Sequence, residues 1–172
     1  MDGTPLGLKT LVPGWPLALF RIAFGLLYLQ MALSKPPWAN YGWLRSWIEQ
    51  EIAHPTFPWM ATFLQEVVLA NFAFFGMLTF VTELALGVAL LLGIFTRLAG
   101  LGGFLWQVNI ALQAYNVPGE WGWIWVLLTL PQFCFAFADA GRVLGVDRWL
   151  EPALRQRAAA GVGWAGLLHH AV

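Results

Sequence analysis

The sequence predicts an all-α integral membrane protein, a four-helix bundle with both termini in the cytoplasm. Of its 172 residues, 59% are hydrophobic and 10% are charged, whereas soluble domains carry roughly 25% charged residues. Because a chain of this size exposes a large share of its atoms, this composition excludes an ordinary cytosolic domain. Nine basic residues balance nine acidic ones, so no net field attracts nucleic acid.

Four apolar segments are long enough to cross a bilayer, which takes about 20 residues of helix. They are predicted at about 15–33, 71–95, 98–116 and 121–139. The first is expected to be a retained span because it is long, contains Arg21 and lacks a signal-peptide cleavage site. The link between the second and third spans is so short that they form an antiparallel hairpin, with small residues on its facing sides.

The basic residues that flank the spans predict their orientation. Lys35 and Arg45 fall on one side of the membrane. Six basic residues fall on the side of the termini: Lys9, Arg97, Arg142, Arg148, Arg155 and Arg157. Cytoplasmic segments carry the excess of Lys and Arg, so both termini are expected in the cytoplasm.

The predicted outer loop, residues 35–70, is rich in tryptophan and contains an amphipathic helix. Four apolar residues share one face of that helix: Trp43, Leu44, Trp47 and Ile48. Charged and polar residues lie on its other face. Such a helix lies in the membrane interface, where it either anchors the loop or forms a lid over a cavity that opens outward.

The chain is expected to divide into a four-span domain, residues 1–145, and a cytoplasmic interfacial tail, residues 146–172. Within the tail, 147–157 is predicted as a second interfacial helix whose arginines face anionic headgroups. Its expected lipid-facing residues are Trp149, Leu150, Ala153 and Leu154. The apolar segment 158–168 is too short to span the membrane.

Two ionisable side chains, Arg21 and Glu83, fall inside predicted spans, where a charge costs roughly 2.5–3.5 kcal/mol on insertion scales. Their depths allow an ion pair. Helix side chains lean toward the N-terminus of their own helix. This tilt directs Arg21 toward the cytoplasmic side and Glu83 toward the opposite side of the membrane, so the sequence does not decide whether the two form an ion pair. Gln107 and Asn109 in the third span lie at nearly the depth of Glu83. The four residues form either interhelical hydrogen bonds or a polar cavity for a quinone headgroup or an ion.

Four further residues are predicted to have structural roles. Gly25 and Gly87 lie one helical turn from Arg21 and Glu83 and allow a neighbouring backbone to approach closely. Arg97 and Asp139 both end spans on the cytoplasmic side. A salt bridge between them would join the hairpin to the fourth span.

The sequence predicts no catalytic residue and no metal site. No histidine lies in a predicted span, which excludes a bis-histidine haem, and the single cysteine, Cys134, excludes an internal disulfide or a CxxC pair. No P-loop, GxGxxG or Ser/His/Asp arrangement is present. We expect no cofactor bound covalently or by protein ligands, so that a quinone or a partner subunit brings any redox chemistry.

Three segments carry a family pattern: Arg21-Ile22-Ala23-Phe24-Gly25 followed by Lys35, Glu83-Leu84-Ala85-Leu86-Gly87 followed by Gly93-Ile94-Phe95-Thr96-Arg97-Leu98-Ala99, and Asp139 with Gly141. They resemble the DoxX/DoxD family of membrane proteins over about residues 16–142, and the long Trp-rich loop is closer to the DoxD type. The resemblance implies a four-helix protein of the bacterial or archaeal cytoplasmic (inner) membrane, associated with quinone-linked redox complexes. DoxD-type proteins are paired with a second subunit in thiosulfate:quinone oxidoreductase.

Three functions are compatible with these observations. The first is a small membrane subunit of a quinone-linked oxidoreductase complex, which anchors a redox partner and lines a quinone site with Arg21, Glu83, Gln107 and Asn109. The second is a purely structural or assembly subunit, in which the buried charges only fix helix register. The third is a small proton-coupled transporter that uses Glu83 as its titrating carboxylate.

Overall fold

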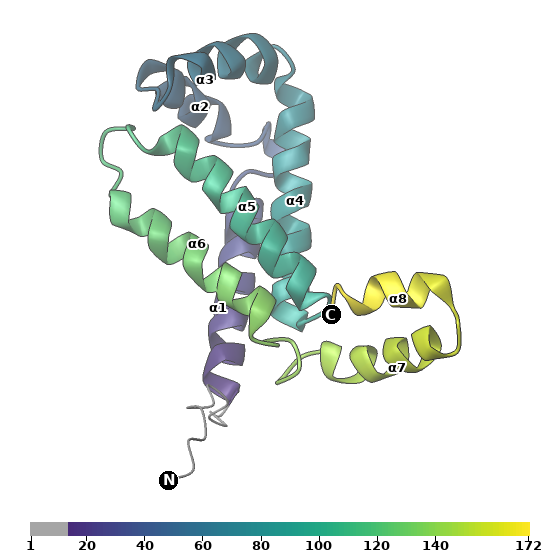
Figure 1. The fold of residues 1–172 in the computed structure, drawn as a ribbon. Coiled ribbons are helices and arrows are strands. Elements are labelled where there is room, and N and C mark those ends of the chain that lie inside the picture. Colours follow the sequence, from purple (N-terminus) through teal and green to yellow (C-terminus); the bar gives the residue numbers. More distant parts are fainter. Residues whose placement is uncertain (1–13) are drawn as a thin grey trace.

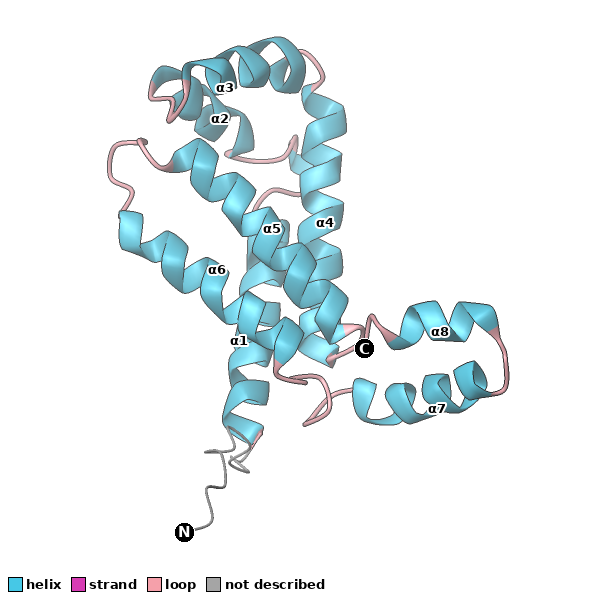
Figure 2. Ribbon diagram, viewed as in Figure 1, coloured by secondary structure: helices cyan, strands magenta, loops and turns pink. Residues whose placement is uncertain are grey.

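The computed structural model of the protein describes residues 14–172, and this part of the chain is entirely helical, with no strand (Figure 1, Figure 2). The predicted Lys9 and the start of the predicted first domain lie outside the described residues. The long helices are α1 (Trp15–Leu33), α4 (Phe72–Leu92), α5 (Thr96–Ala114) and α6 (Gly122–Phe137). The shorter ones are α2 (Leu44–Ala53), α3 (Pro58–Phe63), α7 (Asp147–Ala159) and α8 (Gly163–His169), with a 3-10 turn, η1 (Pro37–Ala39), and a π-helical turn, η2 (Leu64–Leu69).

The long helices coincide with the four predicted spans, and two of them are long and apolar enough to cross a membrane. These are α1 and α4. Helix α6 is apolar but has only 16 residues, or about 24 Å at 1.5 Å per residue. Helix α5 has 19 residues, like α1, and is more polar. All four carry large apolar side chains that are more than half exposed, among them Leu26, Phe74, Leu105 and Leu130.

The long helices pack as two close pairs, α1 with α4 and α5 with α6. At the first contact a Cβ on Gly25 would lie 2.5 Å from the backbone nitrogen of Leu91, and one on Gly87 would lie 2.9 Å from the side chain of Leu29. Both glycines therefore allow the close approach expected of them. Between the pairs lies a core that includes Phe24, Tyr28, Leu90 and Phe135.

The hairpin of α4 and α5 differs from the prediction in what its small residues pack against. A Cβ on Gly100 would meet the backbone nitrogen of Ala136 at 2.8 Å, and one on Gly103 would collide with the side chain of Gln132. Both contacts are with α6. Gly100 and Gly103 thus serve the packing of α5 on α6, whereas Ala99 lies in one apolar cluster with Leu86 and Leu90 of α4.

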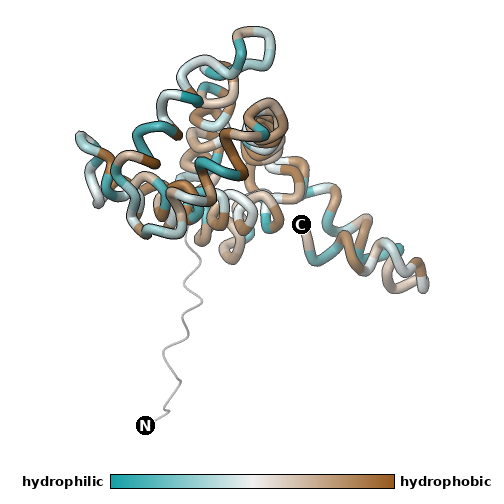
Figure 3. The backbone as a smooth tube through the Cα atoms, turned by 90° about the horizontal axis from the view of Figure 1, so that it is seen from above, coloured by the Kyte–Doolittle hydropathy of each residue, from teal (hydrophilic) through white to brown (hydrophobic). Residues whose placement is uncertain are grey.

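The short helices lie at opposite ends of the long ones (Figure 1). Helices α2 and α3 cover the end at which α4 begins, while the α7–α8 hairpin extends sideways from the end at which α1 begins (Figure 3). At the end covered by α2 and α3, the hydroxyl of Tyr41 donates to the carbonyl of Ala73 at 3.0 Å. The ring of Tyr41 packs against Gly76, where a side chain would leave no room for it. This contact holds the loop after α1 on α4 and so positions α2 above the long helices.

Candidate functional site

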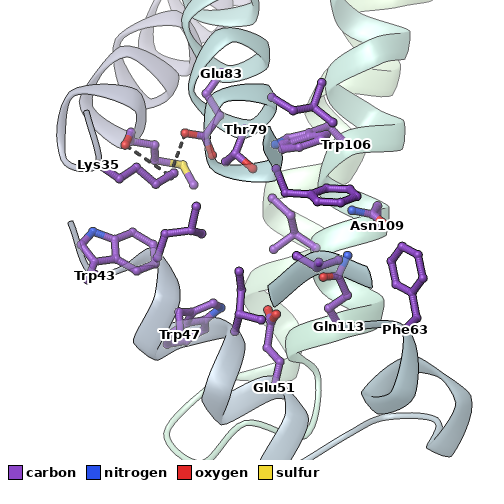
Figure 4. A pocket seen from close by; sticks show the side chains of 17 residues that line it. Lys35, Trp43, Trp47, Glu51, Phe63, Thr79, Glu83, Trp106, Asn109 and Gln113 are labelled. Carbon is purple, nitrogen blue, oxygen red and sulfur yellow. Dashed lines mark hydrogen bonds and ion pairs between the residues drawn. The ribbon is translucent and has the colours of Figure 1, made fainter. Parts of the chain in front are cut away.

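A cavity of about 250 Å³ lies under α2 (Figure 4), which is at the end of the molecule opposite the α7–α8 hairpin (Figure 1). It is lined by the last turn of α1, one face of α2, the π-helical turn η2, and the halves of α4 and α5 that lie nearest to α2. Turns of π-helix are rare and often occur at functional sites. Most of the wall is apolar or aromatic. The polar side chains on it are Lys35, Glu51, Thr79, Glu83, Asn109 and Gln113.

The deepest polar feature of the cavity is an ion pair between Lys35 and Glu83. The ammonium nitrogen lies 2.7 Å from the carboxylate Oε2, and the two side chains are 2% and 1% exposed. Lys35 also donates to the carbonyl of Met31, at 3.2 Å, near the C-terminal end of α1. Because Lys35 lies just beyond the end of α1, its ammonium reaches the carboxylate of Glu83. That side chain leans toward the start of α4, as expected for a helical residue.

A second carboxylate, Glu51, enters the cavity from α2. It is 3% exposed, and Figure 4 shows it directed inward beside Gln113 of α5. Burial raises the pKa of Glu51 from 4.5 to about 7, an effect that a hydrogen bond with Trp47 partly offsets. Near neutral pH this group therefore exists as both acid and carboxylate, so it can donate or accept a proton.

Three tryptophans give the cavity its aromatic wall. Trp43 precedes the first residue of α2 and Trp47 lies on α2, and their rings meet edge to face with centroids 6.0 Å apart. The ammonium of Lys35 lies 5.0 Å from the centre of the Trp43 ring, within the range of a cation–π interaction. Trp106 comes from α5 on the opposite side, next to Glu83 (Figure 4). A flat apolar ring could therefore be held between α2 and α5, with polar groups at its edges.

The structure brings together only two of the four residues predicted to form a polar cavity. Glu83 and Asn109 line it. Gln107 is buried but lies outside the cavity lining, because it is two residues, or about 200° of helix rotation, from Asn109.

The other predicted residue, Arg21, is also buried, at the opposite end of α1. It does not pair with Glu83. Its guanidinium donates to the carbonyl of Leu90 at 2.8 Å and to that of Leu144 at 2.9 Å. Arg21 thus ties α1 to the last turn of α4 and to the loop after α6. A Cβ on Gly93 would collide with this guanidinium.

Two more polar contacts support the bundle away from the cavity. The hydroxyl of Tyr28 donates to the Gln132 side chain at 2.9 Å and joins α1 to α6. Arg97 and Asp139 form the expected ion pair, with 3.0 Å between nitrogen and oxygen. That pair is partly exposed, and such pairs contribute about 0–1 kcal/mol. Neither contact reaches the cavity.

Sequence reasoning missed Lys35 and Glu51 as cavity residues. Lys35 was assigned to the loop side of the first span, and Glu51 received no role of its own. The spacing of Trp47, Ile48 and Glu51 places Glu51 on the apolar face of α2. A charged residue on an apolar face is the feature of the sequence that indicates a cavity residue. Lys35 had a signal too, since it belongs to the first-helix motif of the family that the sequence resembles.

The comparisons with known proteins identify a family. A family model described as TQO small subunit DoxD matches residues 42–165, from the loop before α2 to the middle of α8. No curated protein and no solved structure matches the chain. The matched region contains the cavity residues of α2, α4 and α5, as well as the hairpin motif noted in the sequence. Because the match covers most of the chain, the protein belongs to the DoxD family of small membrane-oxidoreductase subunits.

Proposed function

We propose that this protein is a multi-pass subunit of a quinone-linked oxidoreductase in the cytoplasmic (inner) membrane. In this proposal α1, α4, α5 and α6 form a four-helix bundle across the bilayer, with both termini in the cytoplasm. The apolar outer surfaces of all four helices support it, since water would not solvate them. The basic residues around the α7–α8 hairpin support the orientation. The described chain then comprises the four-span domain and its interfacial tail.

The cavity under α2 is the proposed binding site for a quinone headgroup. The observation that carries this proposal is the Lys35–Glu83 ion pair, 2.7 Å long, in a wall made largely of aromatic and aliphatic side chains. A quinone ring is flat and apolar and carries carbonyl acceptors at opposite edges. Lys35 offers a donor at one side of the cavity, and Gln113 and the neutral form of Glu51 offer donors at another (Figure 4).

Helix α2 then acts as a lid over this site. Its apolar face, with Trp43, Trp47 and Ile48, and its buried Glu51 all line the cavity. A helix that served only as an interfacial anchor would direct this face to lipid. Quinone reduction takes up two protons for two electrons, and Glu51 is placed to supply protons on the outer side. A partner subunit, which this membrane subunit anchors, supplies or accepts the electrons.

A structural role is the second candidate, and the same ion pair favours it. Lys35 and Glu83 join the end of α1 to the middle of α4, and a buried pair of this kind can fix helix register. The transporter alternative receives less support, because the carboxylate of Glu83 is held in a buried ion pair with Lys35.

Binding of decylubiquinone separates the two candidates. The chain is placed in lipid nanodiscs, and its affinity is measured for the wild type and for the double variant Lys35→Met/Glu83→Gln. Replacing both members of a buried pair preserves the fold better than removing one. The quinone-site proposal predicts a folded double variant with at least about a tenfold loss of affinity, equivalent to about 1.4 kcal/mol. Unchanged affinity in the folded double variant would favour the structural role.

The matched control is the pair at the other end of the molecule, changed as Arg97→Gln/Asp139→Asn. It also removes one cation and one anion, but it lies outside the cavity. Its affinity for decylubiquinone is expected to equal that of the wild type. An equal loss in both double variants would mean that the affinity reports general destabilisation and not contact with the quinone.

A further inference from the structure

The α7–α8 hairpin has an outer surface on which cationic and apolar side chains occur together. Trp149 of α7 and Trp164 and Leu167 of α8 are each more than half exposed, the last to 78%. Arg148, Arg155 and Arg157 of α7 are also exposed. The acidic side chains of the hairpin do not offset them, because Asp147 is buried and Glu151 faces Arg142 and His169 at 3.6 and 3.4 Å.

The inner surface of the hairpin is already filled, which corrects the sequence prediction for this tail. Leu150 and Leu154 were expected to face lipid, but Leu154 is buried in a cluster with Ala165 of α8 and Val172, and Leu150 packs against that cluster. The carboxylate of Asp147 accepts hydrogen bonds from the backbone nitrogens of Phe95 and Thr96, each at 2.8 Å. The hairpin is therefore fixed to the start of α5, and its exposed tryptophans and leucines are not the remainder of an internal core.

One contact sets the relative position of the charges and the aromatic rings. The guanidinium of Arg157 lies 5.6 Å from the centre of the Trp164 ring, so a cation of α7 sits against an exposed ring of α8. Tryptophan rings and arginines are the side chains that favour headgroup depth. Figure 1 shows α8 above α7, on the side toward the end of the molecule that carries α2 and α3.

We infer that the α7–α8 hairpin is a membrane-surface foot: α8 inserts Trp164 and Leu167 among the lipids of the cytoplasmic leaflet, and the arginines of α7 bind anionic phosphate headgroups. The inference rests on the proposed membrane topology but not on the quinone site. Charge complementarity argues for lipid, because the exposed charges of this hairpin are cationic and lipid phosphates surround every side of a spanning bundle at this depth. The sideways direction of the hairpin would lay it along the membrane surface (Figure 3).

The test places an environment-sensitive fluorophore at single cysteines, in the full chain with Cys134→Ser, in nanodiscs of phosphatidylcholine with phosphatidylglycerol. The test position is Leu167→Cys. The matched control is Gln156→Cys, an exposed position about 200° of helix rotation from Leu154 and so on the side of α7 away from α8. A third label, Leu105→Cys, lies on the exposed apolar face of α5.

The foot predicts a blue-shifted emission at position 167 that spin-labelled lipid quenches, and an aqueous emission at position 156 that iodide quenches. Replacing phosphatidylglycerol by phosphatidylcholine, or introducing Arg148→Gln/Arg155→Gln, is expected to weaken the lipid quenching at 167. An aqueous label at 167 beside a lipid-quenched label at 105 would overturn the foot and leave the topology intact. Aqueous labels at both positions would overturn the topology itself. Protection at 167 that needs an added partner subunit would also overturn the foot and identify a protein interface.

Discussion

The ammonium of Lys35, just beyond the end of α1, lies 2.7 Å from the carboxylate of Glu83 on α4, and the two side chains are almost completely buried. Each charge is acceptable inside the molecule because the other is present. Removing one partner leaves an uncompensated buried charge, which destabilises proteins by about 3–5 kcal/mol. The same pair forms part of the wall of the cavity under α2 and gives that apolar cavity its polar character.

The first prediction concerns stability. Glu83→Gln and Lys35→Met are each expected to lower the free energy of unfolding by about 3–5 kcal/mol, and the double variant by much less. Thermal unfolding of the three purified variants in one detergent measures this coupling. Additive losses in the double variant would show that the two side chains do not stabilise one another.

The second prediction concerns pH and Glu51. Burial raises its pKa to about 7, so the neutral acid is the form that the fold favours. Its stabilising contribution is complete below the ordinary glutamate pKa of 4.5 and is lost as the pH rises through about 7. Decylubiquinone affinity should fall over the same range, because a carboxylate cannot donate a hydrogen bond to a quinone oxygen.

Glu51→Gln keeps a donor at this position and removes the titration. The variant is therefore expected to bind decylubiquinone with an affinity that is nearly constant between pH 5 and 8. A wild-type affinity that is already independent of pH, or a variant that retains the full pH dependence, would contradict the assignment of Glu51.

The sequence was sufficient for the helices and for part of the site. Long apolar runs, each containing a single charged residue, define α1 and α4 directly, and the Gly93 turn separates α4 from α5. The side on which Glu83 leaves its helix could also be predicted, because the tilt of helix side chains is a local property. The contact with Lys35 could not, since it depends on how α1 and α4 approach one another around Gly25.

The second carboxylate shows the same limit. The helical spacing of Glu51 was visible in the sequence, but its burial depends on α2 lying over the outer ends of α4 and α5. Long-range contacts such as the hydrogen bond between Tyr41, in the loop before α2, and Ala73 of α4 contribute to that position. Gln107 and Asn109 seemed equivalent because they lie at similar depth, whereas the rotation of α5 directs only Asn109 into the cavity.

The third prediction concerns Arg21. Arg21→Lys is expected to destabilise the protein although it keeps the charge. A lysine ammonium cannot replace the planar guanidinium, whose two nitrogens donate to the carbonyls of Leu90 and Leu144. A hydrogen bond to a charged group contributes about 1.5–3 kcal/mol. Thermal unfolding and protease sensitivity of the loop after α6 measure the effect.

Arg142→Gln is the control for Arg21, because it removes an arginine that is partly exposed in this same loop. Its effect on stability is expected to stay within about 1 kcal/mol. The folded Arg21→Lys protein should bind decylubiquinone like the wild type. Lost binding with normal stability would place Arg21 in the site after all.

The fourth prediction compares neighbouring glycines in α5. A Cβ on Gly103 would collide with the side chain of Gln132, whereas one on Gly102 would meet only the side chain of Leu86, at 3.7 Å. Gly103→Ala is therefore expected to destabilise by about 1–3 kcal/mol. Gly102→Ala should stabilise by up to about 1 kcal/mol because alanine favours helix. Equal changes in melting temperature would contradict the packing of α5 on α6.

The central claim is that the cavity under α2 binds a quinone headgroup, and photoaffinity labelling tests it most directly. The wild-type protein in nanodiscs is illuminated with an azido-substituted ubiquinone, and the modified peptides are identified by mass spectrometry. We expect labelling of α2, at Trp43–Glu51, and of α5 near Trp106, with suppression by excess decylubiquinone. Labels confined to the lipid-facing surfaces, or labelling that decylubiquinone does not suppress, would contradict the claim.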